Sequence, residues 1–469
     1  MKKTKIVCTI GPASNNYDTI CKMAKEGMNV ARLNLSHGSQ ESNQKIVDLI
    51  KKVRKDLNLP IAIMLDTRGP ELRFGKFEND KITLKKGDIF TLVAENILGT
   101  CEFASINHPE TLSLLNEGDK VLACNALVVM QVVGKKKGKV ELKVLEGGDI
   151  SNHKSLAFPG KKFNFEYLND ADKSDILFGI KNKIDYLALS FVNGKEDILS
   201  VKDFIKKNGG SIALISKIES SLGVDNLEEI IECSDGIMVA RGDLGVEMPF
   251  EQIPHLQKMM IRKCLMQNKF VITATEMLES MITSSRPTRA EASDVANAVF
   301  DGSSAVMLSG ESAAGKYPVR AVATMSKIVE ETEKYVDHED LHEDYLITSS
   351  DLPYVMAKTV ANLAFELQDI KAVAVYTDSG HTAMMISKHF PPCPIIALTP
   401  NVETYYRLAA IRGVEPYLVK SIKTADKLIS TIDKIVKTSG IVKSKEMVLI
   451  GTGTRKPTNT DMIKIHIVE

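Results

Sequence analysis

The sequence predicts an α/β protein: a (β/α)8 barrel with a small β-domain inserted into it and a further α/β domain after it. Eight short, apolar, β-branched segments alternate with helical stretches over the first two thirds of the chain. Between the third and fourth segments lie short alternating runs and glycine-rich turns, and strand–helix alternation restarts near residue 345. A chain of 469 residues also exceeds what one hydrophobic core usually supports. An open, doubly wound sheet is the alternative to the barrel.

The expected barrel strands are continuous apolar runs, as in strands that are covered on both faces. In chain order they span residues 5–10, 29–33, 61–65, 186–189, 212–218, 236–239, 270–274 and 305–308. The inserted domain is expected at residues 69–160, because Gly69-Pro70 and Pro159-Gly160 interrupt regular structure at its two ends. The barrel then comprises residues 1–68 and 161–335. A hinged domain at the mouth of a barrel is a candidate lid.

The C-terminal domain is expected at residues 345–469, after a charged stretch at 330–343 that we expect to be a long helix or a linker. Its expected strands span residues 372–376, 394–398, 447–450 and 464–468. Two loops, YTDSGHT at 376–382 and GTGTRKPTNT at 451–460, combine glycines with hydroxyl residues that can hold a phosphate. An ordinary turn between a strand and a helix favours the same residues, so both interpretations stay open.

Composition and charge exclude several classes of function. Sixty basic and sixty acidic side chains leave no net charge, which argues against nucleic acid or an anionic membrane as the main partner. The seven cysteines are scattered and contain no Cys-x-x-Cys pair, which argues against a zinc site and favours reduced thiols. No apolar run has the length of a signal peptide or a membrane span, so we expect a soluble, cytoplasmic protein.

At least six of the eight expected strands end in polar residues, although a packed barrel needs none of them. Active sites of such barrels form at the carboxyl ends of the strands, so these residues should converge on one rim. Each alone has a simpler interpretation, such as an ion pair between Lys217 and Glu219 or a helix cap at Asp243. In chain order the residues are Arg32, Asn34, Ser36, Asp66, Thr67, Lys217, Glu219, Gly242, Asp243, Thr275, Ser309 and Glu311.

These residue types suit phosphoryl transfer, which depends on positioning and on the stabilisation of charge. Glu219 and Asp243 offer the hard oxygens that Mg²⁺ prefers. Arg32 and Lys217 supply positive charge for a phosphoryl group, and Gly242 lets backbone amides approach an anion at the start of a helix. The remaining oxygens carry one formal charge and suit a monovalent cation; they belong to Asn34, Ser36, Asp66 and Thr67.

Over essentially its whole length, the sequence resembles pyruvate kinase. The matching runs are TKIVCTIGPAS (4–14), NVARLNLSHG (29–38), LDTRGPELR (65–73), ISKIE (215–219), DGIMVARGDLGVE (235–247), ITATEML (272–278), RPTRAEASDVANAVFDG (286–302) and VMLSGES (306–312). The resemblance implies a catalytic barrel, a β-barrel lid and a C-terminal regulatory domain. It also implies a glycolytic enzyme that transfers phosphate from phosphoenolpyruvate to ADP, works as a homotetramer and binds a phosphorylated sugar or nucleotide effector.

The resemblance further implies a role for each site residue. For Mg²⁺ or Mn²⁺ the matching residues are Glu219 and Asp243. For phosphoenolpyruvate and the phosphoryl group in transit they are Arg32, Lys217, Gly242, Asp243 and Thr275. For K⁺ they are Asn34, Ser36, Asp66 and Thr67, with Glu71 typical of potassium-dependent members. For the nucleotide they are Asn34, His37, Arg73 and Lys154, and for protonation of the enolate they are Thr275, Ser309 and Glu311.

Departures from the family pattern lie mainly around the expected lid. Cys124-Asn125-Ala126 stands where Asp-Asp-Gly is usual, and Glu276 replaces a glutamine beside Thr275. Two rival hypotheses follow: a weak or silent paralogue that acts as a scaffold or metabolite sensor, and a magnesium-dependent enolate lyase on the same barrel. Only the kinase requires a nucleoside diphosphate.

Overall fold

The computed structural model describes the chain apart from residues 1, 37, 125, 162–165, 345–348 and 453–459. Eight parallel strands close a barrel in the order β1-β17-β16-β15-β14-β13-β3-β2. This closure confirms the predicted barrel and excludes an open sheet, and each strand begins and ends within one residue of its expected position. The strands are β1 (Lys5–Thr9), β2 (Val30–Asn34), β3 (Ala62–Asp66), β13 (Tyr186–Leu189), β14 (Ala213–Ile218), β15 (Gly236–Ala240), β16 (Phe270–Ala274) and β17 (Ala305–Leu308).

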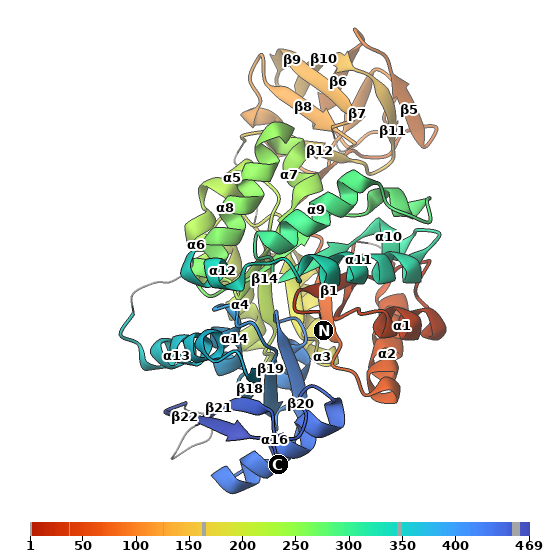
Figure 1. Ribbon diagram of the computed structural model, residues 1–469. Helices are drawn as coiled ribbons and strands as arrows, with labels where there is room; N and C mark the ends of the chain where they lie inside the picture. Colours follow the sequence, from red (N-terminus) through yellow and green to blue (C-terminus); the bar gives the residue numbers. More distant parts are fainter. Residues whose placement is uncertain (1, 37, 125, 162–165, 345–348, 453–459) are drawn as a thin grey trace.

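Helices surround the barrel and bury their apolar faces against its strands (Figure 1). Several begin at a side-chain cap; for example, Asn16, Asn169 and Thr288 each accept a hydrogen bond from a backbone N–H of the first turn. These helices are α1 (Tyr17–Lys25), α2 (Gln40–Leu57), α3 (Asp170–Asn182), α4 (Lys195–Lys207), α6 (Leu227–Cys233), α8 (Ile253–Met266), α9 (Arg289–Phe300) and α11 (Pro318–Thr332). Three short helices directly follow strand ends: α5 (Ser221–Asp225), α7 (Arg241–Glu247) and α10 (Gly310–Ala313).

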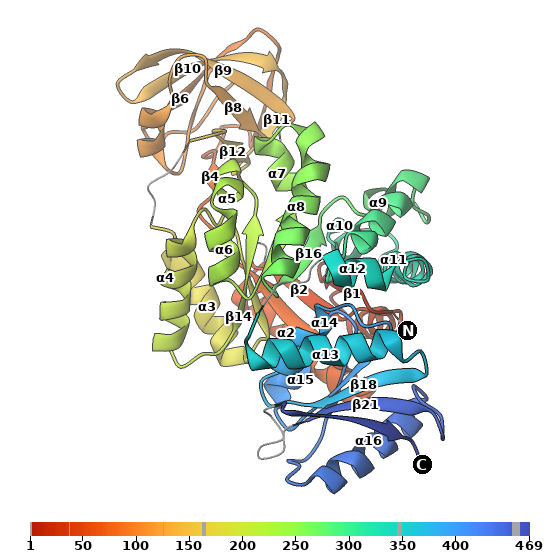
Figure 2. The same ribbon diagram turned by 60° about the vertical axis from the view of Figure 1, so that its left-hand side comes forward.

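The segment between β3 and β13 forms a β-domain that lies beyond α5 and α7, at the carboxyl end of the barrel (Figures 1 and 2). We expected a small β-barrel here; the strands pair as a seven-stranded sheet and a two-stranded ribbon around one shared core. The sheet contains β4 (Leu72–Arg73), β12 (Ser155–Ala157), β8 (Lys120–Ala123), β9 (Val128–Lys136), β10 (Lys139–Glu146), β6 (Ile89–Val93) and β7 (Phe103–Ser105). The ribbon contains β5 (Lys81–Leu84) and β11 (Gly148–Ser151).

The C-terminal domain is a five-stranded sheet with helices on it, in the order β20-β19-β18-β21-β22. All four expected strands are present, and β20 was missed because it contains Pro416. Proline is tolerated there because β20 is an edge strand. The elements are α13 (Leu352–Glu366), β18 (Ile370–Tyr376), α14 (His381–Ser387), β19 (Ile395–Thr399), α15 (Val402–Leu408), β20 (Val414–Leu418), α16 (Ala425–Ser439), β21 (Met447–Thr452) and β22 (Met462–Ile467).

This domain packs against the end of the barrel opposite the inserted domain (Figure 2). Two residues at strand starts make the contact: Tyr186 Oη donates to the carbonyl of Arg407 at 2.7 Å, and Lys5 Nζ donates to that of Val414 at 2.8 Å. The charged stretch before the domain is not one helix, since α11 ends at Thr332 and α12 (His338–Asp344) begins after a turn.

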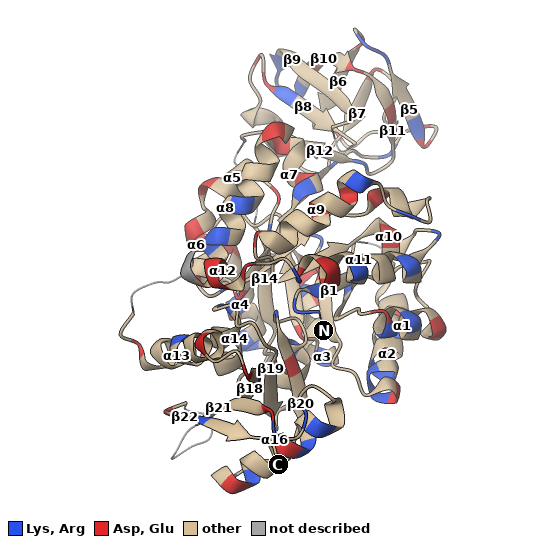
Figure 3. Cartoon of the chain, viewed as in Figure 1, with Lys and Arg blue, Asp and Glu red and all other residues tan. Residues whose placement is uncertain are grey.

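Charged residues of both signs are spread over the whole fold, in agreement with the equal numbers of basic and acidic side chains in the sequence. Figure 3 shows acidic and basic residues distributed over the barrel helices and both smaller domains. Among the helices in the described part of the chain, none combines the length and the apolar character that a bilayer crossing requires.

Candidate active site

Lys217 lies at the centre of a buried polar network at the carboxyl end of the barrel. Its Nζ lies 2.8 Å from Glu219 Oε1 and 3.1 Å from Asp66 Oδ1, and it donates a hydrogen bond to Ser190 Oγ at 2.9 Å. Arg32 binds the other oxygen of Asp66, with its Nε and Nη2 at 2.7 and 2.6 Å from Oδ2. All five residues are less than a tenth exposed. The structure therefore brings together four residues, Arg32, Asp66, Lys217 and Glu219, that the sequence predicts at three strand ends.

Strand register explains this convergence. Asp66 lies opposite Asn34 of β2 on one side and Ala188 of β13 on the other. Ser190 follows two residues after Ala188, and its Oγ lies 3.1 Å from Asp66 Oδ1. The alternation of side chains turns Ser216 the other way from Lys217, toward Ser234, where the two hydroxyls lie 2.6 Å apart.

Burial is the largest influence on the three ionisable partners, but their pKa values shift differently. For Asp66, burial would raise the pKa, yet Arg32 and Lys217 outweigh it and hold the pKa below its usual value. For Lys217, burial would lower the pKa, but Asp66 and Glu219 outweigh it and raise the pKa. For Glu219, burial raises the pKa to about 7 against the opposing charge of Lys217, and Asp243 adds to the rise. A positive charge close to Glu219 and Asp243 would relieve this repulsion.

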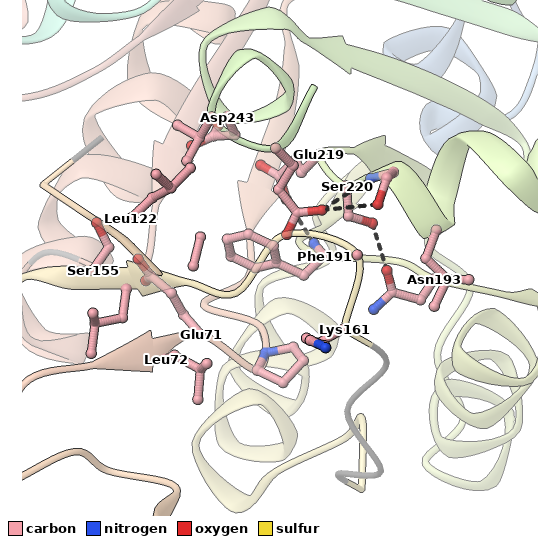
Figure 4. A pocket seen from close by; sticks show the side chains of 18 of the residues that line it. Glu71, Leu72, Leu122, Ser155, Lys161, Phe191, Asn193, Glu219, Ser220 and Asp243 are labelled. Carbon is pink, nitrogen blue, oxygen red and sulfur yellow. Dashed lines mark hydrogen bonds between the residues drawn. The ribbon is translucent and has the colours of Figure 1, made fainter. Parts of the chain in front are cut away.

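A cavity of about 180 Å³ lies between the barrel rim and the inserted domain (Figure 4). Glu219 and Asp243 line it from the barrel, and Glu71 and Ser155 line it from the inserted domain. Phe191 also lines it and donates its backbone N–H to Glu219 Oε2 at 2.7 Å. The two carboxylates predicted as metal ligands thus share one cavity with residues of the expected lid.

The turn after β16 is held in an unusual backbone conformation. Thr275 and Glu276 both have positive φ values, of 65° and 54°, which non-glycine residues rarely adopt. Gly242 N donates to Thr275 Oγ1 at 2.8 Å. Arg241 donates from Nη2 to the carbonyl of Thr275 at 2.6 Å, from Nε to that of Ala274 at 3.3 Å, and from Nη1 to Asp294 at 2.7 Å. Arg241 and Gly242 therefore clamp the predicted substrate residue Thr275 from two sides.

Glu311 is fully buried and connects the turns after β16 and β17. Its carboxylate accepts hydrogen bonds from the backbone N–H of Leu278 at 3.0 Å and of Ser309 at 2.8 Å. Glu311 and Ser309 thus lie together at the same rim, and the carboxylate holds the backbone of both turns.

A second cavity, of about 300 Å³, is lined by Ser36 of the expected potassium site and Arg73 of the expected nucleotide site, but not by Asn34, Asp66 or Thr67. Ser36, Glu71 and Arg73 line it, and Glu71 forms an ion pair with Arg73. The backbone N–H of Ser36 donates to Asn34 Oδ1 at 3.0 Å, and the carbonyl of Thr67 accepts from Ser190 Oγ at 2.8 Å.

Of the residues expected on the nucleotide side, Arg73 alone is placed at this cavity among those that the structure describes, and Asn34 is not part of its lining. Lys154 is exposed on the inserted domain and is not among the residues that line the cavity. His37 lies outside the described residues.

The departures from the family pattern have different surroundings. Cys124 and Ala126 have positive φ values of 53° and 61°, and Ala126 lines the 180 Å³ cavity; Asn125 lies outside the described residues. Glu276 is exposed and lines a different cavity, together with Arg241 and Asp294.

Sequence reasoning missed Ser190 and Arg241. Ser190 follows a strand, as the predicted site residues do, so its position was the available signal. Arg241 precedes Gly242 and Asp243 in the run ARGDLG and was the one charged residue of that run left without a role. Its contacts depend on β16, which lies more than thirty residues later in the sequence.

Comparisons with known proteins agree over the whole chain. Residues 1–322 match the family model described as "Pyruvate kinase, barrel domain", and residues 355–466 match "Pyruvate kinase, alpha/beta domain". The pyruvate kinase of Geobacillus stearothermophilus is 42% identical over 473 residues, which cover all of this chain and 80% of that relative. The pyruvate kinase of Clostridium acetobutylicum is 41% identical over 477 residues, which cover all of both chains.

A solved structure extends this likeness to the fold. The crystal structure of a pyruvate kinase from Cryptosporidium parvum superimposes with a TM-score of 0.95 at 37% sequence identity, and the match covers 100% of this chain and 96% of that one. Both the barrel that carries the Lys217 network and the C-terminal sheet lie within the matched regions. The chain belongs to the pyruvate kinase family.

Proposed function

We propose that the 180 Å³ cavity at the barrel rim is where this phosphotransferase moves the phosphoryl group of phosphoenolpyruvate to ADP, giving pyruvate and ATP in glycolysis. The observation that carries the proposal is the fixed ammonium of Lys217, which Asp66, Glu219 and Ser190 hold and which lies 2.8 Å from Glu219, a residue that lines that cavity. Charge that is already in place needs no reorganisation when the phosphoryl group moves.

Glu219 and Asp243 fit a divalent cation, Mg²⁺ or Mn²⁺. Both line one cavity, and the charge of Asp243 contributes to the raised pKa of Glu219. Within the described ranges, no three acidic, histidine or cysteine side chains group as metal ligands. This agrees with an ion that completes its coordination with substrate oxygens and water. When bound, the ion supplies positive charge that stabilises the phosphoryl oxygens and the enolate.

The oxygens of Asn34, Ser36, Asp66 and Thr67 fit a monovalent cation, K⁺, beside the phosphoryl position. Asn34 and Asp66 are direct neighbours across β2 and β3, and Thr67 follows Asp66 with its carbonyl accepting from Ser190. Asp66 already balances Arg32 and Lys217, so a low-charge ion suits the remaining oxygens better than a second divalent ion.

The side chains of the barrel then have separate tasks. Arg32, held by Asp66 and by Thr9 Oγ1, and Lys217 bind and orient the phosphoryl group in transit. Gly242, Asp243 and Thr275 bind phosphoenolpyruvate. Transfer of the phosphoryl group to ADP leaves the enolate of pyruvate, which receives a proton through a relay of Thr275, Ser309 and Glu311 with water.

On the nucleotide side we propose Asn34, His37, Arg73 and Lys154. Residues 69–160 would act as a lid over the barrel formed by residues 1–68 and 161–335, with residues 345–469 as the regulatory domain. Family resemblance alone supports a homotetramer, a phosphorylated effector and a cytoplasmic location. One of the two loops proposed for the effector, residues 451–460, lies largely outside the described residues.

A steady-state assay tests the proposal. Pyruvate formation from phosphoenolpyruvate is followed with Mg²⁺, K⁺ and ADP, and Lys217→Ala is the control. We expect turnover that requires ADP and that is nearly abolished in the variant. Turnover no higher than that of the variant would favour the silent paralogue, and pyruvate released without ADP would favour the lyase.

A further inference from the structure

A small cavity lies at the opposite end of the barrel, between the starts of its strands and the C-terminal domain. Its volume is about 40 Å³. Phe270 at the start of β16 and Ser304 just before β17 line one side. Lys388 and Phe390, which follow α14, and Arg412, which precedes β20, line the other. Figure 2 shows α14 directly below the barrel, away from the inserted domain and the active site.

The residues that line this cavity carry three cations and no carboxylate. Lys269 turns its Nζ outward, where it donates to the carbonyls of Glu232 and Ser234 at 3.1 and 2.6 Å. Lys388 and Arg412 are 7% and 4% exposed. Burying a cation without a counter-ion costs free energy, so two such cations at one cavity call for an anion.

Arg412 presents an unused binding edge. Its Nε and Nη2 are buried and have no hydrogen-bond partner within the described part of the chain. These two N–H groups lie parallel on one edge of the guanidinium, the edge that binds a carboxylate or phosphate with two hydrogen bonds. The face of the guanidinium lies 4.5 Å from the centre of the Phe390 ring, which fixes its orientation.

The neighbouring charges do not neutralise this edge. The carboxylate of Glu333 affects Arg412 electrostatically, but its two oxygens accept hydrogen bonds from the backbone N–H groups of Lys3 and Thr4, at 2.8 and 2.5 Å. Lys3 adds a further positive charge near Arg412. The Nζ of Lys388 lies 4.5 Å from the centre of the Tyr354 ring, and Lys388 forms no ion pair with any residue that the structure describes.

We propose that this cavity binds a small oxyanion, a carboxylate or inorganic phosphate, through the Nε and Nη2 of Arg412 and the nearby charge of Lys388. A volume of about 40 Å³ suits an anion of the size of acetate or phosphate and is too small to enclose a nucleotide or a sugar phosphate. Because the walls come from two domains, the bound anion stabilises the contact between the barrel and the C-terminal domain. The site is separate from the phosphoenolpyruvate cavity, so the inference does not depend on the proposed mechanism.

Thermal unfolding tests this site. The midpoint is measured at constant ionic strength while the bulky anion 2-(N-morpholino)ethanesulfonate is exchanged for acetate or for inorganic phosphate. We expect the better of the two small anions to raise the midpoint on the order of 2–4 °C at concentrations well above its dissociation constant. The two arms of the experiment show whether carboxylate or phosphate is preferred.

Variants separate this site from anion binding elsewhere. Arg412→Met should lose most of the anion-dependent shift and Lys388→Met part of it. Lys55→Met, an exposed lysine on α2, should keep the full shift. Anions at the active site affect all these proteins equally, so the difference between them reports on the cavity.

An equal shift in wild type and Arg412→Met, or no shift in wild type, would overturn the proposal. Should Arg412→Met fail to fold, Arg412→Lys keeps the charge without the paired N–H edge, and the same loss is expected from it.

Discussion

Replacing Arg241 with lysine tests whether the turn after β16 depends on one side chain. Thr275 and Glu276 adopt left-handed conformations that cost about 1 kcal/mol or more each for non-glycine residues. Arg241 donates to the carbonyls of Ala274 and Thr275 while Asp294 anchors its other end. Lysine keeps the charge but lacks the planar set of donors, so it cannot bind both carbonyls and Asp294 together.

The size of the effect follows from the lost contacts. A hydrogen bond to a charged group contributes about 1.5–3 kcal/mol when buried. Loss of about 2 kcal/mol from the geometry of Thr275 corresponds to a roughly 30-fold lower kcat/KM for phosphoenolpyruvate. The KM for ADP should change little, because Arg73 and the nucleotide-side cavity lie next to the inserted domain and make no contact with this turn. The free energy of unfolding should fall by a similar amount.

A matched variant separates catalysis from stability. Arg54 is also buried, forms an ion pair with Asp185 and stacks on Tyr406, away from the candidate active site. Steady-state kinetics and thermal unfolding of Arg241→Lys and Arg54→Lys are compared with wild type. We expect both to lose stability and only Arg241→Lys to lose activity. If both lose stability alike and the activity of Arg241→Lys stays within about twofold of wild type, Arg241 does not position Thr275.

Four further outcomes are expected. Lys217→Met should lower kcat by about 10³-fold or more and change the KM for phosphoenolpyruvate far less, and an equal loss in both would contradict its action on the group in transit. Replacing K⁺ with tetramethylammonium should lower the rate in the same assay, and an unchanged rate would refute the potassium ligands. Ala126→Gly should remove the strain of a φ of 61° and raise the free energy of unfolding of the inserted domain by about 1 kcal/mol in urea unfolding. An unchanged free energy of unfolding would mean that the turn is unstrained. Burial, with Lys388 and His342, lowers the pKa of His389 from 6.5 to about 3. The unfolded chain therefore binds a proton that the folded one does not, and stability falls as pH drops below 6.5, by about 2 kcal/mol at pH 5. In urea unfolding at pH 7 and pH 5, the His389→Phe variant should lack this pH-dependent loss of stability. If the variant shows the same pH dependence as wild type, His389 is not its cause.

The barrel could be predicted from the sequence because its strands are buried on both faces. A run such as Ala305–Leu308 is apolar at every position, and the glycines and polar residues around it mark its ends. The C-terminal sheet was harder, because its edge strand β20 contains Pro416, a residue that normally argues against a strand. The division of the inserted domain into two sheets could not be predicted, since pairs such as β4 with β12 and β5 with β11 join segments that are far apart in sequence.

The site was predictable where a residue follows its own strand and unpredictable where a contact crosses the barrel. Asp66, Lys217 and Glu219 could be named because each stands at a strand end. Ser190 also follows a strand, β13. Its hydroxyl contacts Asp66 and Lys217 only because the closed barrel places β13 between β3 and β14. No local pattern shows that Arg241 reaches the carbonyl of Thr275.

The structure distinguishes the roles of Asp66 and Glu219, two carboxylates that the sequence places at strand ends without saying how they differ. They are equally buried, at 1% and 2% exposed, yet their pKa values shift in opposite directions. Asp66 lies between two cations and stays charged as the residue that fixes Arg32 and Lys217. Glu219 has one cation and the carboxylate of Asp243 as neighbours, so its ionised form needs further positive charge. Among Arg32, Lys217, Asp66, Glu219 and Asp243, two cations and three carboxylates sum to one negative charge, and a divalent ion at Glu219 and Asp243 would reverse that sign. We therefore expect phosphoenolpyruvate to bind more tightly when the metal is bound than when it is absent.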